Sequence, residues 1–171
     1  MLLVFFLAII ITMAGASVHL SQQEIDDLNK QIDQTRESVE NAGGLQGASI
    51  IFGNNLMICL IMFVPIFGPI FGSIVLYNTG TVIAAESSVS NVNPFLVFLL
   101  LFIFPFTWLE FGAYAIAMAE SFWLIWRLIQ GKWKKELVNT CILIAVCTVM
   151  LFLAAIIEVV LISALSGPAS V

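Results

Sequence analysis

The chain has 171 residues, of which 61% are hydrophobic and only 10% are charged, and its formal net charge is −5. A soluble domain usually carries about 25% charged residues, and no soluble fold could cover this much apolar surface. The acidic balance also excludes a nucleic-acid partner, because a phosphate backbone is bound by clustered Lys and Arg. The first partner to expect is therefore the lipid bilayer.

Long apolar stretches occupy residues 1–18, 50–77, 94–126 and 138–165. A helix needs about 20 mostly apolar residues to span a bilayer. The sequence therefore predicts an all-α fold, a polytopic transmembrane helix bundle that forms one membrane domain over 1–171. We expect about five membrane segments, at least one of them short or broken.

Residues 1–18 are expected to form the first transmembrane helix. The stretch ends in Ala14-Gly15-Ala16, an A-x-A pattern of the kind that signal peptidase cleaves. However, no Lys or Arg precedes the apolar run, as an n-region would require. Small residues also favour close helix packing, which gives Ala14 and Ala16 an ordinary explanation. We favour retention, with signal cleavage as the alternative.

Residues 20–47 are the one substantial polar stretch, and 20–42 are predicted to form an amphipathic extracytoplasmic helix. Ser21 followed by Glu24 is a capping box. Glycines at 43, 44 and 47 end the helix. The segment carries six acidic and two basic residues. It is either a solvated helix over the remaining bundle, 48–165, or a docking helix for a partner outside the membrane.

Charge asymmetry predicts the orientation of a multi-pass protein in the cell membrane. Four of the six basic residues lie in the segment 127–135, and a short basic connection is expected on the cytoplasmic side. The N-terminus is then cytoplasmic and residues 20–47 are extracytoplasmic. If 50–77 is one span, 94–126 must cross twice to bring the basic segment inside.

Pro105 supplies a reason for two crossings, because proline suits the first turn of a helix and not its interior. The arms would then be 94–104 and 105–127. Eleven helical residues rise only about 16 Å, which is too short for a bilayer of about 30 Å. We therefore expect the first arm to begin earlier, near Thr81, or to be a re-entrant half-helix.

Polar and small residues interrupt the 50–77 span. Asn54 and Asn55 lie near its start, Asn78 lies just after its end, and Gly68 and Gly72 form a GxxxG motif that permits close helix approach. Prolines at 65 and 69 leave the carbonyls of 61 and 65 without their usual donors. The expected result is a kinked, tightly packed helix, and the alternative is a cavity lined by freed carbonyls.

Three glutamates lie within apolar stretches that hold no basic residue close by: Glu110, Glu120 and Glu158. A buried carboxylate without a cation must be protonated, hydrogen-bonded or beside a cation-accessible cavity. Helical spacing places small and polar residues on one inward stripe, namely Glu110, Ala113, Ala117, Glu120 and Ser121. A second stripe holds Cys147, Leu151, Ala154 and Glu158.

The predicted polar core therefore comprises Asn54, Asn55, Asn78, Glu110, Glu120 and Glu158, and the predicted helix-packing residues are Gly68, Gly72, Ala113 and Ala117. We expect Glu110 and Glu158 to face the interior near Asn54 or Asn55. Interhelical hydrogen bonding, a proton or cation pathway, and a substrate-contacting site all remain open as their role.

No catalytic constellation is visible in the sequence. There is no Gly-rich nucleotide loop and no HExxH motif, and the single histidine is His19. The three cysteines, at 59, 141 and 147, form no CxxC pair. We therefore expect no enzyme activity of this chain alone, no cofactor and no metal, and we interpret the cysteines as small core residues.

The polar residues resemble the stage II sporulation protein M family of integral membrane proteins. That family has an F-x-N-N element, here Phe52-Gly53-Asn54-Asn55, and an Asn-Gly step, here Asn78-Thr79-Gly80 with one residue inserted. Its Pro-His-Gly-x-x-Glu element is similar to Pro105–Glu110, with proline and glutamate kept but His and Gly replaced. Its Ala-Ala-x-x-Glu element matches Ala154–Glu158.

The resemblance covers about residues 1–165 and implies, in sporulating bacteria, a membrane scaffold that recruits cell-wall hydrolases. The first functional hypothesis is accordingly a non-catalytic scaffold or accessory subunit, assembling with other membrane subunits or with itself. The second is a transporter or channel-like protein that uses the buried glutamates. The third is a subunit that shares a site in a membrane enzyme complex.

Overall fold

The computed structural model of the chain describes residues 1–131 and 133–165. This part of the chain is all-α, as the sequence predicted, and holds seven helices and no strand. The helices are α1 Leu2–Ala16, α2 Gln22–Ala42, α3 Gly44–Met62, α4 Phe67–Ser90, α5 Pro94–Leu101, α6 Pro105–Ile129 and α7 Trp133–Leu165.

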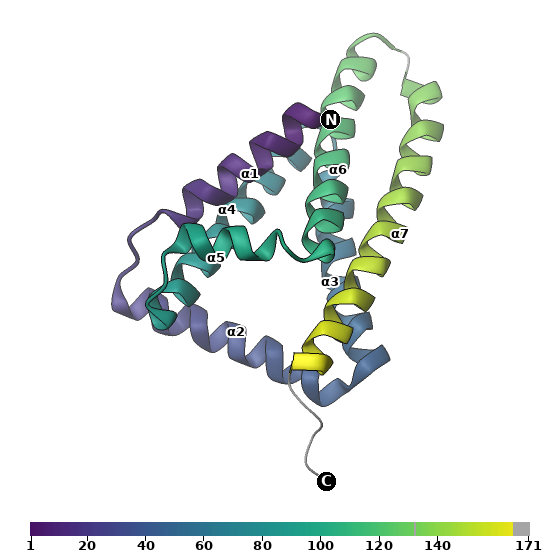
Figure 1. Cartoon of the computed structure of the whole chain (residues 1–171). Helices are drawn as coiled ribbons and strands as arrows, with labels where there is room; N and C mark the ends of the chain where they lie inside the picture. Colours follow the sequence, from purple (N-terminus) through teal and green to yellow (C-terminus); the bar gives the residue numbers. More distant parts are fainter. Residues whose placement is uncertain (132, 166–171) are drawn as a thin grey trace.

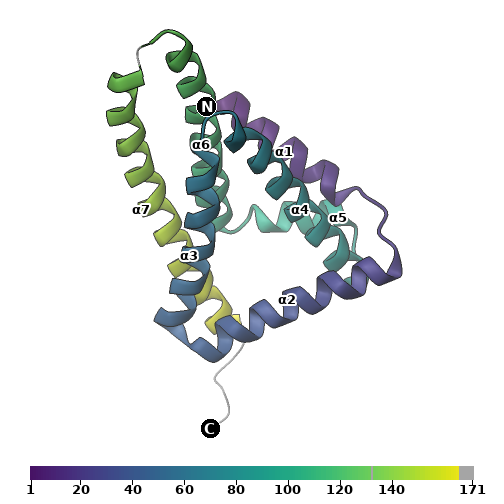
Figure 2. The same ribbon diagram turned by 180° about the vertical axis from the view of Figure 1, so that it is seen from behind.

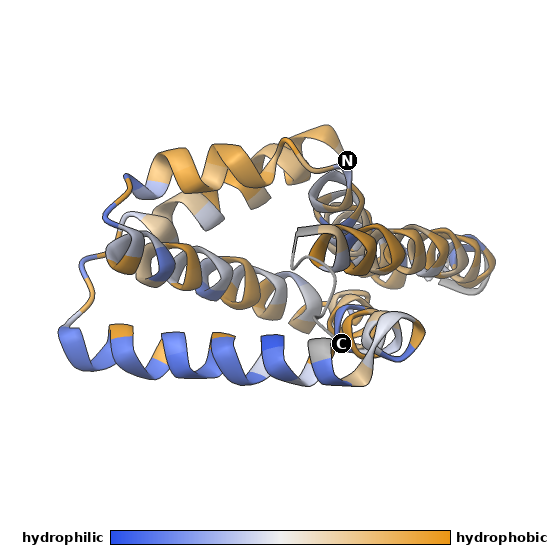
Figure 3. Ribbon diagram, turned by 60° about the horizontal axis from the view of Figure 1, so that its bottom comes forward, coloured by the Kyte–Doolittle hydropathy of each residue, from blue (hydrophilic) through white to orange (hydrophobic). Residues whose placement is uncertain are grey.

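The helices form two groups that are joined by α2. Helices α1 and α4 lie along one another, and α3, α6 and α7 form a second bundle beside them (Figures 1 and 2). Helix α2 runs across one end of both groups and is the one predominantly hydrophilic helix (Figure 3). The α6–α7 connection lies at the opposite end (Figure 1). The charged helix and the basic segment are therefore at opposite ends of the molecule.

Three helices are long and apolar enough to cross a membrane, and they lie at Gly44–Met62, Phe67–Ser90 and Glu136–Ala164. The pair α5 and α6 passes the same test together but is bent by 89°. Helix α1 is apolar and has 15 residues, which rise about 22 Å. A polytopic bundle with short and broken segments is thus confirmed.

The prediction of one kinked span over 50–77 is wrong, because the chain breaks into α3 and α4 at residues 63–66. Pro65 has no N–H to continue α3, and Ile66 adopts a left-handed conformation with φ 69°. The Phe67 amide donates to the Pro65 carbonyl at 2.8 Å, and the Ser121 hydroxyl of α6 donates to the Val64 carbonyl at 2.7 Å. Helix α6 therefore supplies a hydrogen-bond donor to the backbone at the break, as a helix end inside a membrane protein requires.

Replacing Ser121 tests this capping contact. Ser121→Ala is expected to lower the stability by about 1 kcal/mol, because it removes one of the two donors to the Val64 carbonyl and leaves the Gly68 amide, at 2.7 Å, as the other. Ser49→Ala is the matched control, since the exposed Ser49 hydroxyl bonds only to the carbonyl of Leu45 within its own helix. Unfolding in detergent with added SDS measures the difference. Equal stabilities of the two variants would contradict the capping role.

The second predicted break, at Pro105, is confirmed, but the arm before it is shorter than expected. Helix α5 has eight residues and starts at Pro94, while Thr81 lies inside α4. The carbonyls at the end of α5 find donors one turn into α6: the Thr107 hydroxyl at 2.7 Å from the Leu101 oxygen, and the Trp108 indole N–H at 2.8 Å from the Phe102 oxygen. Helices α3 and α4 are two separate candidate spans, where the sequence had predicted one span over 50–77 and an additional arm at 94–104.

Helix α2 begins and ends at features that the sequence predicted. The Ser21 hydroxyl and the Ser21 amide donate to the Glu24 carboxylate at 2.7 Å and 2.8 Å, and these two bonds hold the pKa of Glu24 below its usual value. At the other end, Gly43 has φ 73°, a conformation that favours glycine. A side chain at Gly47 would meet the Val39 carbonyl oxygen at 2.8 Å, so α2 returns closely onto α3. Helix α2 is thus fixed at both ends.

A close helix approach joins α1 to α4 and uses glycines that the sequence reasoning did not select. A Cβ on Gly80 would collide with the Thr12 carbonyl oxygen and the Ala16 nitrogen, and one on Gly15 with the Tyr77 carbonyl oxygen. The backbones of α1 and α4 are therefore in direct contact. Gly72, in contrast, faces the flexible Met118 side chain, whose sulfur would lie 2.8 Å from an added Cβ.

Candidate functional site

A cavity of about 740 Å³ lies between α2 and the membrane helices, and we call it the α2 cavity. Helix α2 contributes polar side chains to its wall, which are Gln31, Gln34, Thr35 and Ser38. The facing helices contribute Asn54, Asn55, Thr79, Glu110, Tyr114 and Glu158. Apolar side chains from α3, α4 and α6 complete the wall. The wall of the cavity thus combines polar and apolar side chains, and the cavity lies at the α2 end of the molecule.

Glu110 and Asn55 form the direct polar contact in this wall. The Asn55 side-chain amide donates to the Glu110 carboxylate across a distance of 2.5 Å. Glu110 belongs to the first helical turns of α6, and Asn55 lies in the middle of α3. The contact therefore links the two helices at the base of the cavity. Hydrogen bonds of this kind between polar side chains join helices within membrane proteins.

Glu158 and Tyr114 lie beside that pair. Glu158, from α7, is close enough to Glu110 for the two carboxyl groups to act on each other electrostatically, and both act on the phenol of Tyr114. Tyr114 lies one helical turn after Glu110 and is 7% exposed. Neither the Tyr114 hydroxyl nor the Glu158 carboxylate has a hydrogen-bond partner within the described residues. Both groups are therefore open to something that enters the cavity.

A second cavity of about 520 Å³ adjoins the first and shares Glu158 with it. Its wall is mainly apolar, with Phe104 and Phe106 on one side and the apolar stripe of α2 on the other. Arg36 also lines this second cavity, and its guanidinium lies 3.9 Å from the exposed carboxylate of Glu86 on α4. The positive charge of Arg36 is thus partly neutralised by Glu86, which lies outside the α2 cavity.

Below the α2 cavity the bundle is closed by a packed layer of fully buried residues: Cys59, Leu76, Ala113, Ala117, Met118, Cys147 and Leu151. The thiols of Cys147 and Cys59 lie 3.6 Å and 3.9 Å from the Ala113 carbonyl oxygen. The two predicted stripes on α6 and α7 therefore face each other here. The described residues of this layer include no ionisable carboxylate or basic group.

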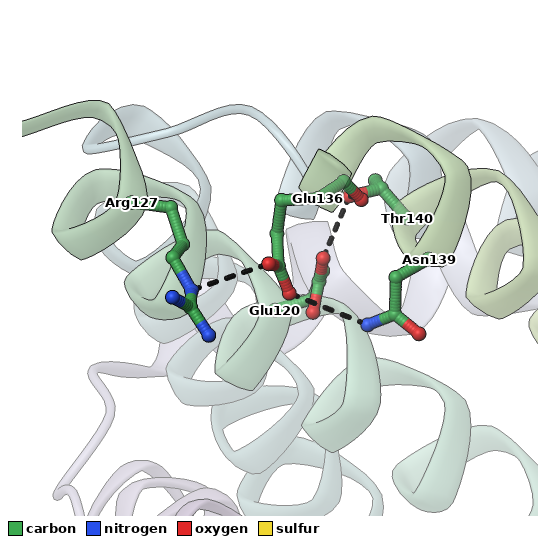
Figure 4. A network of polar contacts seen from close by, with 5 residues as sticks. All are labelled: Glu120, Arg127, Glu136, Asn139 and Thr140. Carbon is green, nitrogen blue, oxygen red and sulfur yellow. Dashed lines mark hydrogen bonds and ion pairs between the residues drawn. The ribbon is translucent and has the colours of Figure 1, made fainter. Parts of the chain in front are cut away.

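Glu120 lies on the far side of the packed layer, in a separate polar network (Figure 4). The Thr140 hydroxyl lies 2.6 Å from the Glu120 carboxylate and 3.0 Å from the Glu136 carbonyl oxygen. The Arg127 Nε lies 3.2 Å from the Glu136 carboxylate and forms an ion pair, although the angle is not that of a hydrogen bond. Glu120 is ten residues from Glu110, about 15 Å along the helix. The three predicted glutamates thus do not form one site.

The remaining predicted residues divide into buried and exposed groups. Ala113 and Ala117 are fully buried in the packed layer, and Gly68 and Gly72 are buried on α4. Asn78 is exposed, and its side chain has no partner in the described chain. His19 is exposed between α1 and α2, and the described residues hold no group of three or more His, Cys, Asp and Glu that could bind a metal.

Sequence comparison places the chain in a family. A family model described as Stage II sporulation protein M matches residues 1–161. The chain belongs to this family. No curated protein and no solved structure matches the chain. The residues by which the chain resembles the Stage II sporulation protein M family lie on the four helices α3, α4, α6 and α7, and Asn54, Asn55, Glu110 and Glu158 among them all line the α2 cavity.

Sequence reasoning missed Tyr114 and the polar side of α2. Tyr114 follows Glu110 by four residues, so helical spacing could have placed it on the same face. The polar residues of α2 gave no such signal, because most side chains of that helix are polar and only the tertiary arrangement selects which ones face the bundle. The Thr140–Glu120 contact likewise joins positions without a common motif.

Proposed function

We propose that this protein is a non-catalytic integral membrane subunit that holds a partner protein at the α2 end of the bundle. The observation that supports the proposal best is the one-sided architecture of the molecule. The α2 cavity offers hydrogen-bonding groups and apolar wall at one end of the molecule, while the packed layer below it consists of fully buried, mostly apolar residues. Such a cavity suits the insertion of a partner's segment, since binding sites combine apolar walls with a few polar groups.

We further propose that the α2 end faces outward and the α6–α7 end faces the cytoplasm. The basic residues of 127–135 support this orientation, because short basic connections stay on the cytoplasmic side. Cysteines introduced at 30 and 134 report it. An impermeant thiol reagent added to intact cells is expected to label Lys30→Cys and not Lys134→Cys, and the reverse labelling would overturn the orientation.

A proton or cation pathway is the second candidate, and the unpaired carboxylate of Glu158 favours it. Ionisable residues within membrane segments commonly mark ion paths. A path through this chain would have to connect the α2 cavity to the network at Glu120. The packed layer argues against such a connection, because an ion there would pass more than one turn of helix without a charged side chain.

Site-specific photo-crosslinking in native membranes distinguishes the two candidates. A photoreactive residue at Gln34, which lines the α2 cavity, is expected to give one protein adduct of defined mass. The same residue at Leu3, which is 77% exposed on α1, is the matched control and is expected to reach lipid only. A doubled mass would identify a second copy of this chain as the partner.

Reconstituted liposomes complete the comparison. The purified wild type is expected to carry no proton or alkali-cation flux above that of empty liposomes. Two results together would refute the subunit proposal and support the pathway. The first is a flux that Glu110→Gln abolishes although the variant still folds, and the second is that the photoreactive residue at Gln34 gives adducts with lipid alone.

A further inference from the structure

The ionisable wall residues of the α2 cavity are all acidic. Glu110 and Glu158 both line it, and none of its described wall residues is basic. One cation, Arg36, lines the adjoining cavity and pairs with Glu86. Two partly buried carboxyl groups close together favour a counter-cation, because their mutual repulsion and their partial loss of solvent both oppose their ionisation without one.

Tyr114 gives an independent indication of a ligand. Its side chain is more than nine-tenths buried, lines the α2 cavity and leaves its hydroxyl without a hydrogen-bond partner among the described residues. The hydroxyl oxygen itself is open to the cavity, so a group that enters the cavity can reach it. A phenol can accept a hydrogen bond from an N–H group, and an aromatic ring attracts a cation over its face.

The volume of the α2 cavity and its apolar wall residues indicate which kind of cation fits. The cavity holds about 740 Å³, and residues such as Ile58, Val75 and Phe111 supply apolar wall beside the polar groups. A metal ion would leave most of this apolar surface uncovered, since Ca²⁺ takes six to eight oxygen ligands and Mg²⁺ keeps several waters. A chain of methylene groups with a charged end fits both parts of the wall.

We propose that the α2 cavity binds an alkylammonium or alkylguanidinium group, presented by a Lys or Arg side chain of the partner. Glu158 and the Tyr114 hydroxyl receive its N–H groups, while Glu110, oriented by Asn55, supplies the second negative charge. The carboxamides of Gln31 and Gln34 on α2 lie on the opposite wall. This inference rests on the proposed function for the source of the cation, but the charge preference of the cavity can be measured without a partner.

Reaction of a cysteine in the cavity with charged thiol reagents tests the charge preference. Asn54→Cys in the purified full-length protein is treated with a cationic methanethiosulfonate-ethyltrimethylammonium or an anionic methanethiosulfonate-ethylsulfonate, and the rates are followed by mass spectrometry. The reference position is Gln23→Cys, exposed on the first turn of α2 and outside the cavity. The cationic-to-anionic rate ratio at 54 is expected to exceed the reference ratio by about tenfold.

Variants assign that preference to the two carboxylates. Glu110→Gln combined with Glu158→Gln is expected to return the ratio at 54 to the reference value, whereas Glu37→Gln, which removes an exposed charge of α2 outside the cavity, is expected to leave it unchanged. If Asn54→Cys does not fold, Thr79→Cys reports from the same cavity. A ratio at 54 or 79 equal to the reference ratio would overturn the cation site.

Protection of the introduced cysteine identifies the source of the cation. A partner side chain is expected to slow the labelling of the introduced cysteine in native membranes but not after purification. The small cations n-butylammonium and n-butylguanidinium are expected to protect the same cysteine in the purified protein only at millimolar concentration. Tight protection by spermidine would assign the group to a free amine and overturn the partner as its source. A charge-selective cavity without adducts at Gln34 would refute the proposed function alone, and adducts without charge selectivity would refute this inference alone.

Discussion

Gly80→Ala is expected to cost at least about 3 kcal/mol of stability, more than typical overpacking, because backbone atoms confront the added methyl group on several sides. The Thr12 carbonyl oxygen and the Ala16 nitrogen both lie within contact of the new Cβ, and neither can move without displacing α1. The expected result is loss of the α1–α4 pair. Thermal unfolding in detergent and the yield of folded protein measure the effect.

Two other glycines serve as controls for this prediction. A Cβ on Gly53 of α3 would meet nothing within 4 Å, so Gly53→Ala is expected to be neutral or to stabilise by up to about 1 kcal/mol through helix propensity. Gly72→Ala meets the movable end of Met118 and should fall between the two. A Gly80→Ala protein as stable as Gly53→Ala would show that α1 does not pack against α4 in this way.

Glu110→Ala is expected to destabilise the bundle by about 2 kcal/mol, whereas Glu110→Gln is expected to remain near the wild type. Alanine leaves the part-buried Asn55 amide without its acceptor in the wall of the α2 cavity, and the loss of a hydrogen bond to a carboxyl group is costly. Glutamine keeps an oxygen in reach of the same amide. SDS-induced unfolding of the purified protein measures the stability of each variant.

A double-mutant cycle isolates the contact between the two side chains. Asn55→Ala and Glu110→Ala together should cost less than the sum of the single changes, because each change alone leaves the other group unpaired. Glu37→Ala, which alters an exposed carboxylate of α2, provides the matched control. Strict additivity of the two changes would mean that the hydrogen bond contributes nothing to the fold.

Much of the architecture could be predicted from periodicity and from helix-breaking residues. The apolar stretches give the helical class, the Ser21–Glu24 box gives the start of α2, and Pro105 gives the start of α6. The break between α3 and α4 was harder to predict, since Pro65 is compatible with either a kink or a turn. The outcome depends on the Ser121 hydroxyl, which comes from a helix more than 50 residues away.

The site could be predicted only in part, for a similar reason. Unpaired glutamates in apolar runs drew attention to Glu110 and Glu158, and Asn55 was an expected neighbour. The division of the glutamates between two ends of the bundle is a tertiary property. So is the close approach at Gly15 and Gly80, because the glycines belong to different helices and form no motif together. Single-sequence patterns describe one helix at a time.

Thiol accessibility on α3 tests most directly whether the molecule has a one-sided cavity over a closed layer. Asn54 lines the α2 cavity, and Cys59 lies five residues further along the helix, about 7 Å deeper, with no exposed surface. In reconstituted vesicles, a small cationic methanethiosulfonate reagent is expected to modify Asn54→Cys from the α2 side and to leave Cys59 unmodified from either side. Modification of Cys59 in folded protein, from the α2 side or from the α6–α7 side, would reveal a water path through the packed layer and contradict the account.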